Sequence, residues 1–469
     1  MKLLKLTFVA TLLVLITSCN QANKQMMELI PEDATAVVAI DLAKVIDHTG
    51  VKIDDNGKLE LPGALNDMMK AYQKDVDEAM DQLMKANIDP SAKVFIYSEL
   101  SDFNHPEVNV LAITKDPGAA KEVIEKESKK KFESVDGVDV LTTGTTAFAF
   151  KDNMIAVIGD AKGVDAKVKT IFEKKEKSIV GNEEIMKTME ADADINYYMN
   201  YQAYMKLVGQ MNPQAALVQG FFSGYRGVGV NISLADNEIN AKSEVFADEN
   251  SDMVKLLNSV KGKASADFLE YMPTSAKCIF SVSINGEKLA EFEQVKSVFH
   301  MASAQMPQAD FVELVKSVNG PVAVGIDADV KAFQGSLTGS IVITTSKAAD
   351  WKALFDQVFS QLGGGAPVQV TAEAKKDALV VKFGAHSNFT LDASANKDAA
   401  SLFDDNFSGF WLGLNVDGME MSTVAGAEDC NHGDLKFLIK GKDGNKMIFG
   451  DYPIYFQALE AAAKQNSGL

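Results

Sequence analysis

Two pairs of neighbouring side chains have the residue types that nucleophilic catalysis uses. Cys430 and His432 form a local thiol–imidazole pair, and Ser128 and Lys131 have an SxxK spacing. The carboxylates just before Cys430 would raise the pKa of its thiol and disfavour the reactive thiolate. Ser128 lies in a Lys- and Glu-rich run that is typical of a solvated helix face. The sequence therefore favours a structural role for both pairs over catalysis.

Motifs for metals, cofactors and phosphate groups are absent from the sequence. There is no GxxxxGK[ST] loop, no GxGxxG after a strand, no HExxH and no GxSxG. The five histidines do not pair at metal-ligand spacing. The acidic run 54–57 resembles a fragment of a calcium loop but lacks its later ligands, so a hairpin turn is the better interpretation. We predict no metal site and no cofactor.

Arg226 is the single arginine of the chain, and it follows Tyr225 in a glycine-flanked segment near an aromatic cluster. A guanidinium beside aromatic rings is suited to an anion or to a protein partner. The alternative is a structural ion pair, which an acidic protein offers many opportunities to form. We take Arg226 and Tyr225 as candidate binding residues and leave both interpretations open.

The N-terminus has the order of a secretory signal. Lys2 and Lys5 are followed by an apolar run over 6–16 and then by small residues before Cys19. The apolar run is too short to span a bilayer, which needs about 20 residues. This order predicts export from the cytoplasm.

The segment Ile16-Thr17-Ser18-Cys19 resembles the bacterial lipobox, in which the cysteine is acylated and becomes the first residue. We therefore expect a lipoprotein signal peptide at 1–18, lipidation of Cys19 and a tether at 19–27. Several acyl chains on one residue give stable membrane anchoring. The tether lacks an acidic cluster, which favours the periplasmic face of the outer membrane over the cell surface.

The charge balance excludes some partners. The chain has a formal net charge of −19 at pH 7 with 46 Lys plus Arg. Nucleic-acid binding needs a basic surface, so we predict none. An acidic surface also repels anionic lipid headgroups, so membrane contact is expected through the lipid at Cys19 alone. The other two cysteines, Cys278 and Cys430, either form a disulfide or remain separate thiols.

The sequence contains an internal repeat. An apolar-Pro segment at 30–34 leads into an apolar run at 37–42, and the same pattern recurs at 272–276 and 279–284. A second match, of 110–114 with 341–345, has an offset of 231 residues, whereas the first has an offset of 242. The difference of 11 residues equals the length of 51–61, where the sequence predicts an inserted β-hairpin.

Periodicity then predicts the elements that position these residues. Apolar residues at helical spacing recur over 65–83 and 351–362 and predict helices there. Segments with a two-residue apolar period, which predict strands, alternate with these helical segments along the chain. We predict an α+β fold of two tandem related copies, at 28–255 and 256–469. Each copy is expected to be a largely antiparallel sheet with helices packed on one face.

The lipobox, the Pro-acidic segment at 30–34, the strand after it and Asp47-His48-Thr49-Gly50 together resemble a family of Bacteroidetes lipoproteins catalogued as domain of unknown function 4836. This resemblance implies lipidation and a place in the cell envelope. It implies no activity and no site residues.

Three functions remain open. The chain is a non-enzymatic binding or assembly protein of the envelope, a hydrolase of an envelope glycan or peptide polymer, or a solute- or glycan-binding lipoprotein. We favour the first, with the membrane and an envelope protein as partners, because it needs no catalytic motif.

Overall fold

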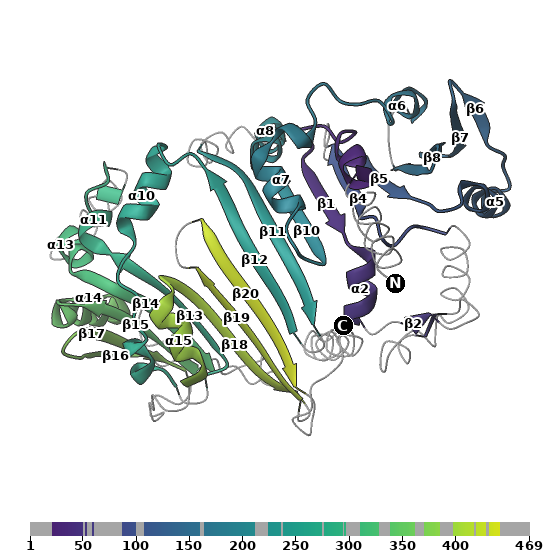
Figure 1. Ribbon diagram of the computed structural model, residues 1–469. Coiled ribbons are helices and arrows are strands. Elements are labelled where there is room, and N and C mark those ends of the chain that lie inside the picture. Colours follow the sequence, from purple (N-terminus) through teal and green to yellow (C-terminus); the bar gives the residue numbers. More distant parts are fainter. Residues whose placement is uncertain are drawn as a thin grey trace, which may run out of the picture. The chain divides into compact units, whose positions relative to one another are not determined.

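The computed structural model divides into two compact units (Figure 1). Unit 1 contains 1–236, 244–246 and 448–454, and unit 2 contains 237–243, 247–447 and 455–469. The structure describes residues 21–49, 52–53, 59–60, 87–99, 107–159, 164–211, 224–235, 238–273, 276–293, 295–296, 310–327, 338–361, 370–384, 397–416, 419–427 and 431–440.

Unit 1 is built on an antiparallel sheet in the order β11-β10-β1-β4-β5-β9-β8-β7-β6. Along each strand, alternate side chains point to opposite faces, and Val37 and Ala39 of β1 are buried on one of them. The strands are β1 (Ala36–Ile40), β4 (Val94–Glu99), β5 (Glu107–Ile113), β6 (Glu133–Val135), β7 (Val138–Thr143), β8 (Thr146–Lys151), β9 (Met154–Gly159), β10 (Ile195–Asn200) and β11 (Tyr225–Ala235).

Helices cover both faces of this sheet. One face packs against residues 21–27, α6 (Val164–Thr170) and α7 (Glu183–Met189), in a core that includes Ala149 and Ala156. The neighbouring residues Phe150 and Ile155 point the other way and pack against α5 (Pro117–Ser128). The other helices of unit 1 are α2 (Leu42–Thr49), the 3-10 turn η2 (Ile179–Gly181) and α8 (Tyr201–Met211).

Unit 2 is also an antiparallel sheet, in the order β20-β19-β18-β13-β14-β15-β17-β16. Its core lies between the sheet, the 3-10 turn η3 (Asp267–Tyr271) and α15 (Lys397–Asp405). The strands are β13 (Cys278–Asn285), β14 (Val318–Asp327), β15 (Thr338–Thr345), β16 (Val370–Ala374), β17 (Ala378–Phe383), β18 (Ser408–Val416), β19 (Met419–Ala427) and β20 (His432–Lys440).

The remaining elements are short helices and three strands. They are β2 (Lys52–Ile53), β3 (Leu59–Glu60), β12 (Glu238–Ala247), α10 (Asp252–Val260), α11 (Gly286–Leu289), α13 (Phe311–Lys316) and α14 (Ala348–Gln361). β2 and β3 pair antiparallel within the region 51–61. The helix expected over 65–83 lies outside the described residues.

The predicted class, α+β with antiparallel sheets, is confirmed. The strand order of unit 1 from β11 to β8 repeats in unit 2 from β19 to β16 when strands are matched in chain order. Tandem duplication itself stays a prediction. The expected placing of helices on one face is wrong for unit 1, because the α5 side of β8 and β9 is also apolar and needs its own cover.

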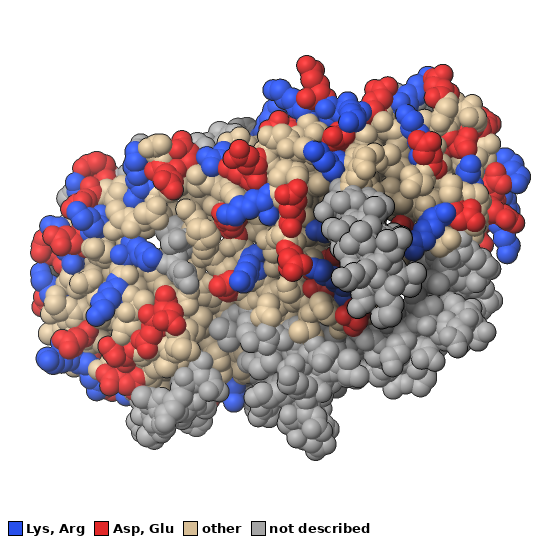
Figure 2. Space-filling model, in the orientation of Figure 1, with Lys and Arg blue, Asp and Glu red and all other residues tan. Residues whose placement is uncertain are grey.

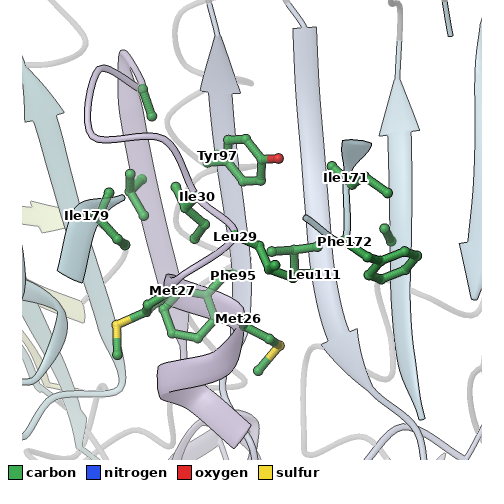
Figure 3. Packing of buried hydrophobic residues seen from close by; sticks show 14 of the residues in the cluster. Met26, Met27, Leu29, Ile30, Phe95, Tyr97, Leu111, Ile171, Phe172 and Ile179 are labelled. Atoms are coloured by element: carbon green, nitrogen blue, oxygen red, sulfur yellow. The ribbon is translucent and has the colours of Figure 1, made fainter. Parts of the chain in front are cut away.

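Residues 21–27 form a helix that belongs to the fold, although the sequence predicts a flexible linker there. Met26 and Met27 of this helix, together with Leu29 and Ile30 after it, are buried in the core of unit 1 (Figure 3). The polar residues at 20–24 do not predict this helix, because the apolar side chains that pack it into the core follow them in the sequence. Residues 21–27 thus belong to the folded body of unit 1.

Candidate functional site

A cavity of about 600 Å³ opens beside this first helix, entirely within unit 1. Its walls come from the helix at 21–27, the start of α2, the residues leading into β4 and the end of α7. We call it the Lys93 cavity. It is lined by Asn23, Lys24, Met27, Asp41, Lys44, Lys93, Phe95, Met189, Glu190, Ala191 and Asp192.

The apolar part of the wall is formed by core residues. Met27 of the first helix and Phe95 of β4 are both buried in the same core cluster (Figure 3). Met189, the last residue of α7, is buried in the same core cluster. The cavity is therefore bounded on this side by residues whose positions the packing of unit 1 fixes.

Lys93 provides the only half-buried cation of the cavity wall that lacks a carboxylate partner among the described residues. Its ammonium donates to the carbonyl oxygen of Met189 at 2.8 Å and to Oδ1 of Asn196 at 3.0 Å. Burial lowers the pKa of Lys93, because desolvation disfavours the charged form, while Asp41 and other nearby carboxylates partly oppose this shift. Two of its three N–H donors are thus occupied by neutral acceptors.

The α2 side of the cavity is held by carboxylates. Asp41 follows β1, and its Oδ1 accepts a hydrogen bond from the Lys44 backbone N–H at 3.2 Å, which satisfies a free donor of the first turn of α2. Lys44 forms an ion pair with the exposed carboxylate of Asp192. That contact raises the pKa of Lys44 and lowers the pKa of Asp192.

A second carboxylate holds the other end of α2. Asp194 has a side chain only 2% exposed, and its Oδ1 lies 2.6 Å from Nδ1 of His48. Its Oδ2 accepts a hydrogen bond from the Leu234 backbone N–H at 3.0 Å. Asp192 and Asp194 therefore hold α2 at two points along its length, and so fix the cavity wall that α2 provides.

The charges of the described residues that line the cavity balance one another. The cations among them are Lys24, Lys44 and Lys93, and the anions are Asp41, Glu190 and Asp192. Within the described part of the chain, the side chains of Lys24 and Glu190 form no hydrogen bond or ion pair. Over the described surface in Figure 2, basic and acidic side chains are likewise interspersed, with no extended basic region. Such a cavity is suited to binding by paired charges.

The structure also places the residues that the sequence singled out. Arg226 on β11 contacts Glu184, with Nη2 2.6 Å and Nε 2.7 Å from Oε1, and its side chain is 44% exposed. The ring centroid of Tyr225 lies 6.3 Å from that of Tyr201. Neither residue lines the Lys93 cavity. The ion pair is the alternative left open for Arg226, and a role in binding stays a prediction.

Several other candidates are not brought together. Cys19 and Cys430 lie outside the described residues. Cys278 is an unpaired thiol of β13 in the described part of the chain, and burial raises its pKa. Lys131 is bound to Glu125 at 2.5 Å, and Ser128 Oγ contacts the Glu125 carbonyl oxygen, so the SxxK spacing forms no nucleophile–base pair.

Among the described residues, no group of three or more His, Cys, Asp or Glu side chains is arranged to hold a metal ion. None of the helices in the described ranges combines the length and apolar character required to cross a bilayer.

Sequence reasoning missed Lys93 and the first helix. Lys93 bonds with Met189 and Asn196, which are 96 and 103 residues away along the chain, so no local pattern marks it. Asp41 and Asp192 did carry a signal. The first ends the repeated strand and the second lies in an acidic run, but their partners across the fold could not be read from spacing.

Comparison with known proteins identifies the family. A family model described as "Domain of unknown function (DUF4836)" matches residues 26–361. The chain belongs to the DUF4836 family. The match begins at Met26, inside the first helix. It includes the residues that line the Lys93 cavity from Met27 onward, whereas Asn23 and Lys24 precede it. No curated protein matches the sequence.

The solved structures that match the chain include two crystal forms of TP0453. Crystal form I has a TM-score of 0.29 and 10% identity, covering 47% of this DUF4836 chain and 77% of the other. Crystal form III has a TM-score of 0.30 and 11% identity, covering 50% and 84%.

Proposed function

We propose that this DUF4836 protein is a lipid-anchored, non-enzymatic binding protein of the bacterial cell envelope. Cys19 carries the acyl chains, and unit 1 presents the Lys93 cavity as the binding site. The anchor lies at the outer membrane, with the folded body on its periplasmic face. Partners in this proposal are the membrane, through the lipid, and a ligand or envelope protein that reaches the cavity.

The observation that supports the proposal most is the helix at 21–27. Its described part begins at residue 21, two positions after Cys19 in the sequence. Met26 and Met27 bury this part of the helix in the core of unit 1, so the acylated residue would be close in sequence to a segment that the core holds in place. A lipid on Cys19 would therefore keep the Lys93 cavity, whose wall this helix forms, close to the headgroup region.

Binding is favoured over catalysis by what surrounds the cavity. A hydrolase needs an acid and a base, or an activated nucleophile, converging on one point. The carboxylates at the Lys93 cavity instead have structural partners or face solvent, since Asp41 caps α2 and Asp192 binds Lys44. Its volume of about 600 Å³ is within the range of small-ligand sites.

The anchor is tested by metabolic labelling with a palmitate analogue in cells that express the full chain. We expect label on the wild-type protein and its recovery with outer-membrane vesicles. Cys19→Ser removes the acceptor, so we expect loss of label and retention of the signal-bearing precursor. Cys278→Ser provides the matched control, because this cysteine lies on β13 and should leave labelling unchanged.

Labelling that persists in Cys19→Ser, or a wild-type protein that carries no acyl chain, would contradict the proposal. Surface accessibility then separates the two faces of the membrane. Externally added protease should leave unit 1 intact in whole cells if the body is periplasmic, and should degrade it after the outer membrane is opened.

A further inference from the structure

We propose that the Lys93 cavity binds a small zwitterion, a molecule that carries an anionic group and an ammonium group a few bonds apart. Lys93 would receive the anionic group, and Asp41 with Glu190 would receive the ammonium. This inference rests on the proposed function, since it names the ligand of that binding site.

The anionic end follows from the geometry of Lys93. An ammonium has three N–H donors. The Met189 carbonyl and the Asn196 side chain take two of them, and no described carboxylate lies within ion-pair distance. A half-buried charge that faces a cavity with a donor unused gains most from an acceptor that carries negative charge. A phosphate or carboxylate oxygen provides this.

The ammonium end follows from the opposite wall. Asp41 uses Oδ1 for the Lys44 N–H and keeps its second oxygen unpartnered in the described structure. The carboxylate of Glu190 is exposed, and no described residue forms a hydrogen bond or ion pair with it. These oxygens line the same cavity as Lys93.

Charge balance then selects the ligand class. Among the described residues that line the cavity, three are cationic and three are anionic. A purely anionic ligand would face Asp41, Glu190 and Asp192, and a purely cationic ligand would face the lysines. Each such contact with a like charge costs affinity. A zwitterion satisfies both sets, and Met27, Phe95 and Met189 offer it an apolar wall.

A purely structural role of Lys93 does not account for the site. Its bond to the Met189 carbonyl does satisfy the C-terminal end of α7, as a lysine often does. Such a role requires no cavity and no unpaired Asp41 and Glu190 around the same ammonium. The capping bond positions Lys93 and leaves its remaining donor for a ligand.

Two sources supply this chemistry, a lipid headgroup and a free peptide or amino acid. Isothermal titration of the purified full chain in non-ionic detergent, whether or not Cys19 is acylated, tests both, with phosphoethanolamine and glycylglycine as probes. Ethanolamine, acetate and inorganic phosphate carry one sign of charge each. We expect at least one zwitterion to bind. Every probe that carries only one sign of charge should bind at least about tenfold more weakly, as loss of a charged hydrogen bond implies.

Two variants locate the binding. Lys93→Met keeps the length of the side chain and removes its charge, and Asp41→Asn keeps the capping oxygen and removes the charge. Each should weaken zwitterion binding by about tenfold or more. Lys352→Met is the matched control. It removes a lysine of α14 in unit 2 that pairs with Asp356, and should leave binding unchanged.

The outcomes are distinct. Stronger binding of phosphoethanolamine assigns the site to a headgroup, and stronger binding of glycylglycine assigns it to a peptide end. Absence of binding by either zwitterion, equal binding of acetate or ethanolamine, or undiminished binding by Asp41→Asn would overturn the inference. None of these results depends on acyl labelling of Cys19, so failure of the ligand assignment and failure of the lipid anchor are separable.

Discussion

The two units arrange their strands in the same order but differ at the end of the central strand. In unit 1, β1 ends at Ile40, and the next residue, Asp41, lines the same cavity as Lys93. In unit 2, β13 ends at Asn285, whose Oδ1 accepts the Lys288 N–H at 3.1 Å just as Asp41 accepts that of Lys44. The cap is common to both units, and the charge belongs to unit 1 alone. Capping therefore explains the oxygen of Asp41 but not its negative charge.

The cavities of the two units differ in the same way. Unit 2 has a cavity of about 350 Å³ between α13 and α14, lined by Asp310, Glu313, Leu314, Lys347, Asp350, Ala353, Leu354 and Gln357. Glu313 already binds Lys316 and Lys347, which lowers its pKa, and Asp310 caps α13. Among its described lining residues, three acidic side chains accompany one lysine, Lys347. Glu313 and Asp310 thus have structural partners, whereas in unit 1 the second oxygen of Asp41 and the carboxylate of Glu190 have no described partner.

The segments before the central strands are alike. Residues 21–27 in unit 1 and η3 in unit 2 both precede a buried apolar residue and a proline, Ile30-Pro31 and Met272-Pro273. If both segments are core, Met26→Ala and Leu269→Ala should each lower the free energy of unfolding by about 2–5 kcal/mol. Chemical denaturation measures this. Lys24→Ala, on the exposed side of the first helix, should change it by less than about 0.5 kcal/mol.

A Met26→Ala variant as stable as Lys24→Ala would contradict the placing of residues 21–27 in the core. It would also remove the reason for a short attachment to Cys19.

The ion pairs on α2 and α11 differ in burial: Asp194, which binds His48 of α2, is buried, whereas Lys288 of α11 and its partner Glu291 are exposed. Because Asp194 is buried and loses a partner, His48→Ala should cost about 1–3 kcal/mol of unfolding free energy. Lys288→Ala on α11 removes an exposed pair with Glu291 and should cost less than about 1 kcal/mol. Equal costs in the two variants would show that Asp194 does not hold α2 through His48.

The two capping residues allow a finer test. Asp41→Ala and Asn285→Ala should each cost about 1 kcal/mol, because each loses the acceptor for a helix N–H. Asp41→Asn should change the unfolding free energy by only a few tenths of that amount, since the acceptor remains. Thermal unfolding resolves this difference. A large cost for Asp41→Asn would mean that its charge stabilises the fold, and would weaken the case for a ligand.

Acid should affect unit 2 through Glu373, and this is the smallest effect. Lys375 and Lys382 lower the pKa of Glu373 from 4.5 to about 2. A lowered carboxyl pKa adds stability above pH 4.5, and that contribution is lost as the pH falls from 4.5 to about 2. Wild type and Glu373→Gln should therefore differ slightly at pH 7 and converge near pH 2. A constant difference across this range would exclude the pairing.

The sequence predicts those parts of the fold and of the site in which the interacting residues are close together along the chain. Apolar runs at 37–42 and 279–284 predicted β1 and β13, and the helical period at 351–362 predicted α14, because neighbours along the chain determine these patterns. Lys93 and its partners meet only through tertiary packing. The polar residues 20–24 predict a flexible linker within the tether at 19–27, whereas burial of Met26 and Met27 depends on a surface that the rest of unit 1 supplies.

Amide hydrogen exchange across residues 21–27 of the lipidated full chain tests most directly whether the fold begins next to the anchor. The structure predicts slow exchange for Met26, Met27 and Glu28, comparable to that of β1, because the backbone is helical and buried in the core. Exchange at the rate of an unstructured chain, with β1 still protected, would show that a flexible tether joins Cys19 to the body. It would contradict the placing of the Lys93 cavity at the membrane.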